Sequence, residues 1–158
     1  MRIGTILLLE SAVTARFLFL SASAFAQTQF DRQNLAIQAQ GGKTHSFEVE
    51  LALTAEQRAQ GLMHRESMPS DHGMLFDFGQ TRPVSMWMKN TPLPLDMLFI
   101  RKDGTISHIH ERAVPFSEAV IDSRGPVAFV LELNGGRAAA LGIEIGDPGI
   151  NKRIGEGK

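Results

Sequence analysis

The chain has 158 residues, a formal net charge of −1 from 16 Lys and Arg against 17 Asp and Glu, and no cysteine. This length suits one domain, and the near-neutral charge argues against nucleic acid or an anionic membrane as the main partner. Without cysteine, the chain has no disulfide bond, thiol nucleophile, thiolate metal site or lipid-attachment cysteine.

The first 26 residues have the character of an export leader. Seventeen of them are apolar, and they end in Ala24-Phe25-Ala26, an A-x-A processing pattern. The apolar run Phe17–Phe25 is much shorter than the roughly 20 residues that cross a bilayer. We therefore expect a signal peptide that is cleaved near Ala26-Gln27, and a periplasmic or secreted protein with no membrane span after cleavage. A retained N-terminal anchor is the alternative.

The mature chain begins with a polar stretch that contains a weak strand around Leu35 and Ile37. A clear alternation of apolar and polar residues then predicts a strand at His45–Ala52. Thr54-Ala-Glu-Gln57 has the capping-box pattern and precedes apolar residues at helical spacing. It therefore begins the main predicted helix, Ala55–His64.

The remaining residues form short strands punctuated by glycine and proline. The predicted strands are Met74–Phe78, Pro83–Asn90, Leu95–Ile100, Thr105–Val114, Val127–Asn134 and a last one near Ile150, with a short helical turn at Arg137–Leu141. This spacing favours a mainly β fold, a jelly-roll-like sandwich or barrel. The chain divides into a signal peptide (1–26), an N-terminal extension with the weak first strand (27–45), one β-rich domain (46–150) and a flexible C-terminal tail (151–158).

Five motifs in the mature chain carry a resemblance to a known family. They are Gly61-Leu-Met-His-Arg65, Gly73-Met-Leu-Phe76, Trp87-Met-Lys-Asn-Thr91, Pro94-Leu-Asp96 and Leu131-Glu-Leu-Asn-Gly135. From about Phe47 to Asp147 the sequence resembles the prokaryotic family called domain of unknown function 192. The resemblance implies a small exported or membrane-anchored domain with a jelly-roll-like β fold, and it implies no activity.

Six methionines of the mature chain are concentrated between Met63 and Met97. Met86 and Met88 are two residues apart on a predicted strand, so both should face one side and Trp87 the other. Thioethers suit Cu(I), and an indole ring can cap a cation. A copper site of Met86, Met88, Trp87 and a histidine is therefore one hypothesis. We favour the alternative that the methionines fill the core, with no cofactor.

His108 and His110 have a second metal-like spacing. On a strand both imidazoles would face one side and supply half of a Zn²⁺ or Cu²⁺ site. A third ligand would have to come from Glu118, Asp122 or His45. We favour the alternative that this strand face is solvent-exposed.

Asp96 is a polar residue in an apolar run and shares a strand face with Leu98 and Ile100. A buried carboxylate needs a partner. One interpretation is a buried ion pair with Arg65 or Lys89 that fixes the neighbouring turn. The other is a polar pocket for a small anionic or hydroxylated ligand. The residues of this predicted polar cluster are Arg65, Trp87, Lys89, Asn90, Asp96 and Glu132.

The signatures of serine hydrolases, zinc peptidases and P-loop enzymes are missing from the sequence. We therefore expect a monomeric, extracytoplasmic β-rich module that binds a small ligand or an envelope protein without catalysis. The alternative is a small periplasmic, hydrolase-like enzyme in which Asp96 acts as a general base with Lys89 or Glu132.

Overall fold

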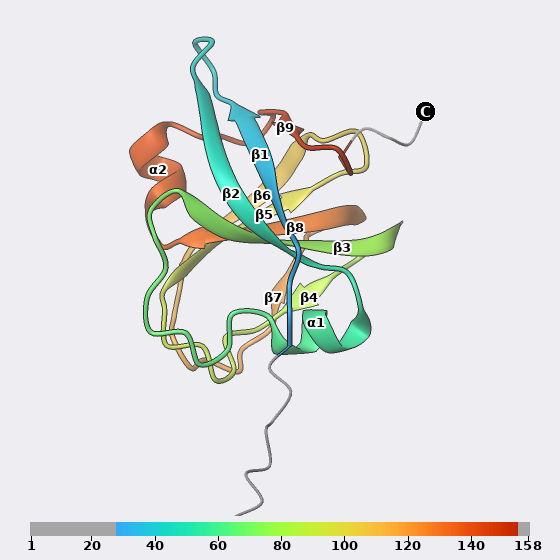
Figure 1. The fold of residues 1–158 in the computed structure, drawn as a ribbon. Coiled ribbons are helices and arrows are strands. Elements are labelled where there is room, and N and C mark those ends of the chain that lie inside the picture. The colour runs from blue at the N-terminus through green and yellow to red at the C-terminus, as the bar shows by residue number, and fades with distance from the viewer. Residues whose placement is uncertain (1–27, 155–158) are drawn as a thin grey trace, which may run out of the picture.

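Most of the predicted strands are confirmed, and they form one curled sheet (Figure 1). The computed structural model describes residues 28–154, so the predicted signal peptide lies outside the described residues. In chain order the elements are β1 (Arg32–Gln38), β2 (Thr44–Ala52), α1 (Ala55–Gln60), β3 (His72–Arg82), β4 (Ser85–Met86), β5 (Leu95–Ile100), β6 (Ile106–Ala113), β7 (Ile121–Asp122), β8 (Val127–Asn134), α2 (Arg137–Leu141) and β9 (Gly149–Ile150). The fold is mainly β, as predicted.

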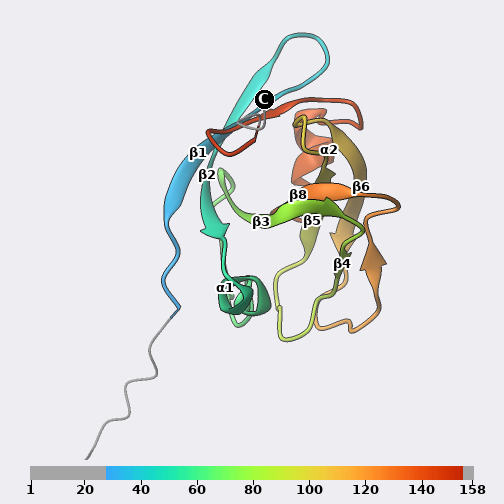
Figure 2. The same cartoon turned by 90° about the vertical axis from the view of Figure 1, so that its right-hand side faces the viewer.

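The large sheet has the strand order β6-β5-β8-β3-β2-β1-β9, and β4 pairs with β7 in a small second sheet. Within the large sheet β2 and β3 run parallel, and the other recorded pairs are antiparallel. The Ile106 N–H donates to the Asp147 carbonyl (3.0 Å), and the Gly149 N–H donates to the Gly104 carbonyl (2.9 Å). These bonds join the segment before β9 to the segment at the start of β6. The two edges of the sheet therefore approach each other, and the sheet curls into a half-barrel (Figure 2).

The two faces of the sheet bury different side chains. One face, which we call the leucine face, carries mainly leucine, isoleucine and valine, and α2 packs at its end. The opposite face, the methionine face, carries Met74, Phe76, Met97 and Phe99 under β4, β7 and the neighbouring loops. β5 is buried along its whole length because both of its faces are covered. Adjacent residues of β5 therefore point into different cores.

The helix α1 begins as predicted and ends earlier. The Thr54 hydroxyl accepts from the Gln57 N–H (3.1 Å) and the Gln57 side chain accepts from the Thr54 N–H (3.0 Å), which confirms the capping box. The predicted end at His64 is wrong, because Gly61 turns the chain with a φ of 47°. A side chain at Gly61 would also lie 3.2 Å from the Phe76 ring.

The predicted strand Pro83–Asn90 is mostly wrong. Only Ser85–Met86 is a strand, and it pairs with the short strand β7. Beyond it, the Met88 N–H donates to the Ser117 carbonyl (2.9 Å) and the Thr91 N–H donates to the Met88 carbonyl (3.1 Å). The second bond closes a turn over residues 88–91, and the first joins this turn to the loop that follows β6.

The C-terminal end of the described chain packs on the sheet. The Asn151 amide donates to the Asn34 carbonyl (2.8 Å), and Ile154 is buried on the leucine face. Residues 151–154, which the sequence placed in a flexible tail, are therefore part of the folded domain. Across residues 28–154 there is no helix with the length and apolar character that crossing a membrane would need.

Candidate ligand-binding site

Asp96 lies on the leucine face with no exposed surface, and its partners are backbone amides. Its Oδ1 accepts from the N–H groups of Arg112 (2.8 Å) and Gly136 (2.8 Å), and its Oδ2 accepts from the N–H of Ala138 (2.9 Å). The carboxylate therefore fastens the end of β6 and the start of α2 to β5. An acceptor of this kind satisfies N–H groups that the short helix leaves free.

The predicted ion pair of Asp96 with Arg65 or Lys89 is wrong, because backbone N–H groups already occupy both oxygens. Asp96 also cannot share a substrate with Glu132. The residue that pairs with Glu132 in the sheet is Met97, the neighbour of Asp96 on β5. Since consecutive side chains of a strand point to opposite faces, the two carboxyl groups lie on opposite sides of the sheet.

Glu132 lies on the methionine face at the centre of the sheet. Its cross-strand neighbours are Met74 on β3 and Met97 on β5, both completely buried. The side chain is 4 % exposed, and burial raises the pKa of Glu132 to about 8. Within residues 28–154 no hydrogen-bonding or charged partner acts on this carboxyl, and burial is the only cause of its raised pKa. At neutral pH it is therefore mostly uncharged, and it can both donate and accept a hydrogen bond.

A small cavity of about 30 Å³ opens beside this carboxyl, and we call it the Glu132 pocket. It lies between the C-terminal end of α1 and the turn that follows β4. Its lining residues are Arg58, Ala59, Gln60, Gly61, Leu62, Met63, Phe76, Met86, Trp87, Lys89, Thr91 and Glu132. A space of this size holds one or two water molecules, or one small polar group of a larger ligand.

Trp87 and Lys89 are the two pocket residues with the clearest binding chemistry. Trp87 is 49 % exposed, and the Lys89 Nζ lies 5.2 Å from the centre of its ring. Arg58 also lines the pocket, but its guanidinium group already has partners: one of its nitrogens donates to the carbonyls of Leu53 (2.5 Å) and Asp77 (2.9 Å). The pocket therefore combines an uncharged acid, an ammonium group and an indole ring.

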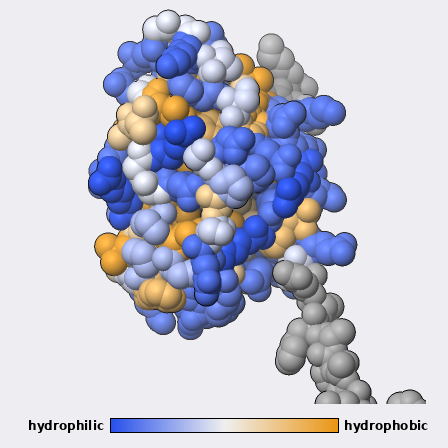
Figure 3. All heavy atoms as spheres, turned by 60° about the vertical axis from the view of Figure 1, so that its left-hand side comes forward, coloured by the Kyte–Doolittle hydropathy of each residue, from blue (hydrophilic) through white to orange (hydrophobic). Residues whose placement is uncertain are grey.

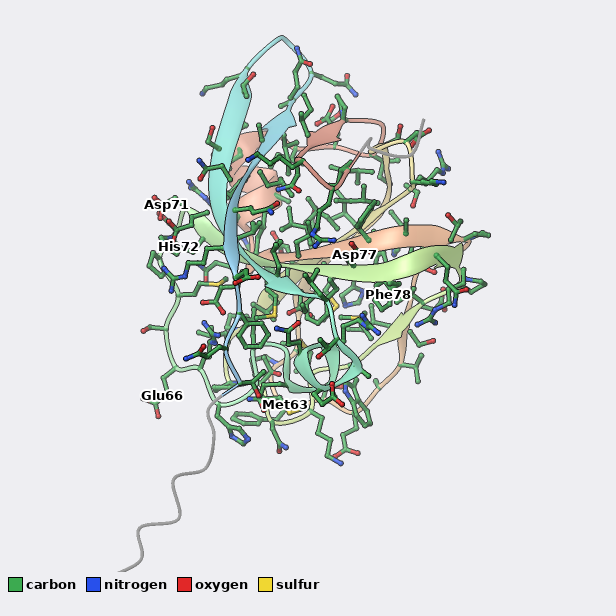
Figure 4. The ribbon with its side chains drawn as sticks, turned by 45° about the vertical axis from the view of Figure 1, so that its right-hand side comes forward. Met63, Glu66, Asp71, His72, Asp77 and Phe78 are labelled. Atoms are coloured by element: carbon green, nitrogen blue, oxygen red, sulfur yellow. The ribbon has the colours of Figure 1, made fainter. Side chains whose placement is uncertain are left out.

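Asn90 joins the two loops beside the pocket and does not line it. Its carbonyl accepts from the His64 N–H (2.8 Å), and its amide contacts the Met63 Sδ (3.9 Å). His64 and Asn90 both have positive φ, 63° and 53°. Histidine and asparagine tolerate this conformation better than most residues do. Figure 4 shows Met63 near α1, apart from Asp71 and His72 at the start of β3.

Arg65 lies outside the Glu132 pocket, in an adjoining open groove of about 870 Å³. Its guanidinium makes a two-point ion pair with Glu50 (2.9 and 2.5 Å) and lies 5.7 Å from the Phe30 ring. Of the predicted polar cluster, the structure therefore brings together Trp87, Lys89 and Glu132. The motif Gly61-Leu-Met-His-Arg65 contributes Gly61, Leu62 and Met63 to the pocket lining, and none of the three belongs to the predicted polar cluster.

The methionines mostly fill the methionine face. Met74, Met88 and Met97 are completely buried there. Met86 lines the Glu132 pocket, whereas Met88 does not. Met86 and Met88 therefore do not face one common site, as the copper hypothesis requires, because Met88 packs in the core.

His108 is buried and its ring stacks on Phe99, with ring centres 5.5 Å apart. The predicted solvent-exposed face is therefore wrong at this residue. Burial is the main cause that lowers the pKa of His108, with smaller contributions from Arg124 and His110. Within residues 28–154 no group of three His, Asp or Glu side chains could hold a metal ion, so the pair His108 and His110 gains no third ligand there.

Comparison with known proteins gives a family and two similar structures. Residues 36–148 match the family model DUF192, described as "Uncharacterized ACR". The crystal structure of a candidate transcription regulator from Sinorhizobium meliloti has 58 % sequence identity and a TM-score of 0.78, over 79 % of this chain and 97 % of that one. A protein of unknown function from Novosphingobium aromaticivorans has 37 % identity and a TM-score of 0.73, over 75 % of this chain and 84 % of that one. No curated protein matches this chain.

Proposed function

This chain belongs to the DUF192 family, and we propose that it is an extracytoplasmic, non-enzymatic module that binds a neutral hydroxylated ligand at the Glu132 pocket. The observation that carries the proposal is a buried carboxyl with no partner in the described chain, beside a cavity of about 30 Å³. Water in this cavity can hydrogen-bond to the carboxyl in the free protein. A ligand hydroxyl that displaces this water can make the same hydrogen bonds to the carboxyl.

The chemistry of the pocket favours a hydroxyl group. An uncharged carboxyl pairs well with a hydroxyl, since each can donate and accept. The cavity admits only one small group, so the rest of the ligand must lie outside, where Trp87 is 49 % exposed. An indole ring packs against the apolar face of a sugar, and the Lys89 ammonium beside it can donate to further hydroxyls. A neutral sugar is therefore the ligand class that best fits the three groups.

The leader and the charge support the location and the kind of partner. The A-x-A pattern at Ala24-Phe25-Ala26 is the basis for export. Removal of the leader takes away Arg2, Glu10 and Arg16, which changes the formal charge from −1 to −2. This balance disfavours DNA binding, the activity that the description of the Sinorhizobium protein would suggest.

The test is a titration of tryptophan fluorescence with a panel of neutral mono- and disaccharides, since Trp87 is the single tryptophan. We expect at least one sugar to change the emission in a saturable way. Glu132→Leu and Lys89→Ala should weaken this response at least about tenfold, because each removes a hydrogen-bonding group from the site. Lys102→Ala, which changes an exposed lysine outside the pocket, should leave it unchanged. A panel without any saturable response, or a response that survives in Glu132→Leu, would contradict the proposal.

A further inference from the structure

Four large apolar side chains are exposed on two loops that touch each other. They are Trp87 (49 %), Val114 (68 %), Phe116 (63 %) and Val120 (71 %), and we call them the apolar loop patch. The Phe116 N–H donates to the Thr91 carbonyl (3.1 Å), and the Ser117 carbonyl accepts from Met88 (2.9 Å), so the loops lie side by side. Figure 3 shows apolar side chains on the lower part of the molecule among polar ones. Exposed apolar groups that gather in this way mark an interaction surface.

Phe116 is held in a conformation that its own residue type disfavours. Pro115 and Phe116 are the central residues of a turn that the Ser117 N–H closes by donating to the Val114 carbonyl (3.2 Å). Phe116 has a φ of 60°, at a turn position that glycine or asparagine normally takes. Packing inside the protein does not compensate for this strain, because the ring is 63 % exposed. Strain at an exposed aromatic residue points to a role outside the folded chain.

The described chain begins at the same end of the molecule. Thr28 and Phe30 line one groove with Met63 and His64. His64 in turn donates to the Asn90 carbonyl (2.8 Å), next to the apolar loop patch. In Figures 1 and 2 the ribbon starts at the lower end, with α1 and these loops, whereas β9 lies at the upper end. The described chain therefore begins at the end of the molecule that carries the apolar loop patch.

We infer that the apolar loop patch docks on the surface of the membrane to which the leader directs the chain, with Trp87 and Phe116 inserted at the level of the lipid headgroups. Tryptophan favours this interfacial region because one part of its ring system is apolar and its N–H is polar. Lys89, whose Nζ lies over the Trp87 ring, suits the same level because a lysine can hold its ammonium group at the polar surface. The inference does not depend on sugar binding.

The charge of the chain defines the kind of contact. A formal charge of −2 after loss of the leader gives no attraction to anionic lipids. Insertion of apolar side chains must then supply the binding free energy, so zwitterionic and anionic membranes should bind the protein about equally. This expectation separates apolar insertion from electrostatic adsorption.

The experiment uses the chain from Gln27, so that the leader itself cannot bind lipid; both cores lie within residues 28–154. Vesicles of phosphatidylcholine, with and without phosphatidylglycerol, are added at millimolar lipid. The emission of Trp87 should shift to shorter wavelength and be quenched by lipids brominated on their acyl chains. Phe116→Gly should reduce vesicle binding by about tenfold, since it removes one inserted aromatic side chain. Its melting temperature should stay equal or rise, since glycine accepts the positive φ.

A matched control comes from the other end of the molecule. Ile145 is 56 % exposed and precedes β9, so Ile145→Ser should bind vesicles as the wild type does. An unshifted Trp87 emission, wild-type binding by Phe116→Gly, or binding that requires phosphatidylglycerol would each overturn the inference. Dimerisation that Phe116→Gly abolishes, without vesicle binding, would assign the patch to a second copy and would also overturn it.

Discussion

Replacement of Asp96 by alanine is expected to lower the free energy of unfolding by about 3–5 kcal/mol. The change leaves the N–H groups of Arg112, Gly136 and Ala138 without their acceptor. Each unsatisfied buried N–H costs about 1–3 kcal/mol, and hydrogen bonds to a charged acceptor are at the upper end of the usual range. Urea unfolding followed by circular dichroism measures the difference.

Asp103 provides the matched control for this experiment. It is an exposed aspartate whose carboxylate accepts one backbone N–H, from Thr105 (2.9 Å). Asp103→Ala should therefore cost about 1 kcal/mol or less. Equal losses in the two variants would show that Asp96 does not fasten β6 and α2 to β5. A fully stable Asp96→Asn variant without function would instead restore the interpretation of Asp96 as a reacting group.

Replacement of Glu132 by glutamine is expected to stabilise the protein in a pH-dependent manner. Burial raises the pKa of Glu132 from 4.5 to about 8. Between these values the unfolded chain has lost the proton that the folded chain still holds, so the wild type loses stability as the pH rises. Below pH 4.5 the carboxyl is protonated in both states and this loss is absent; above about pH 8 the loss is complete. Its total is on the order of 5 kcal/mol.

The measurement compares urea unfolding of the wild type and Glu132→Gln from pH 4 to pH 9. Other titrating groups are common to both proteins, so the difference in stability isolates Glu132. The advantage of Glu132→Gln should grow from about pH 4.5 to pH 8 and then level off. A difference that does not change with pH would mean that this carboxyl is either paired or open to water in the folded protein.

The sequence predicted the parts of the fold that depend on local pattern. Leu95–Ile100 and Val127–Asn134 are strands with the predicted bounds, because long apolar runs between turn residues leave little choice. The capping box at Thr54 was likewise recognisable from two residues. The strand Pro83–Asn90 was not correctly predicted, because Met88 and Thr91 make backbone hydrogen bonds to Ser117 and Phe116, in a loop far along the chain, instead of to a neighbouring strand.

In the candidate site, too, features that depend on neighbouring residues were predicted from the sequence, whereas contacts between distant residues were not. The burial of Asp96 was predicted, because this residue lies in an apolar run and shares a strand face with Leu98. The groups that bind the Asp96 carboxylate could not be predicted from the sequence, because they are backbone amides 16 to 42 residues away. The grouping of Glu132 with Trp87 and Lys89 was a prediction from motifs, and these residues do line one pocket. The register of β5 against β8 separates Asp96 from them, and register is set by tertiary pairing.

The proposed binding site depends on a protonated Glu132 carboxyl that has no protein partner and faces an open pocket. The most direct measurement is an NMR titration of its side-chain carboxyl carbon, assigned by the loss of that signal in Glu132→Gln. We expect a midpoint near pH 8 in the free protein and a displaced signal when a neutral sugar from the panel binds. A midpoint near 4.5, with no response to any sugar, would contradict it.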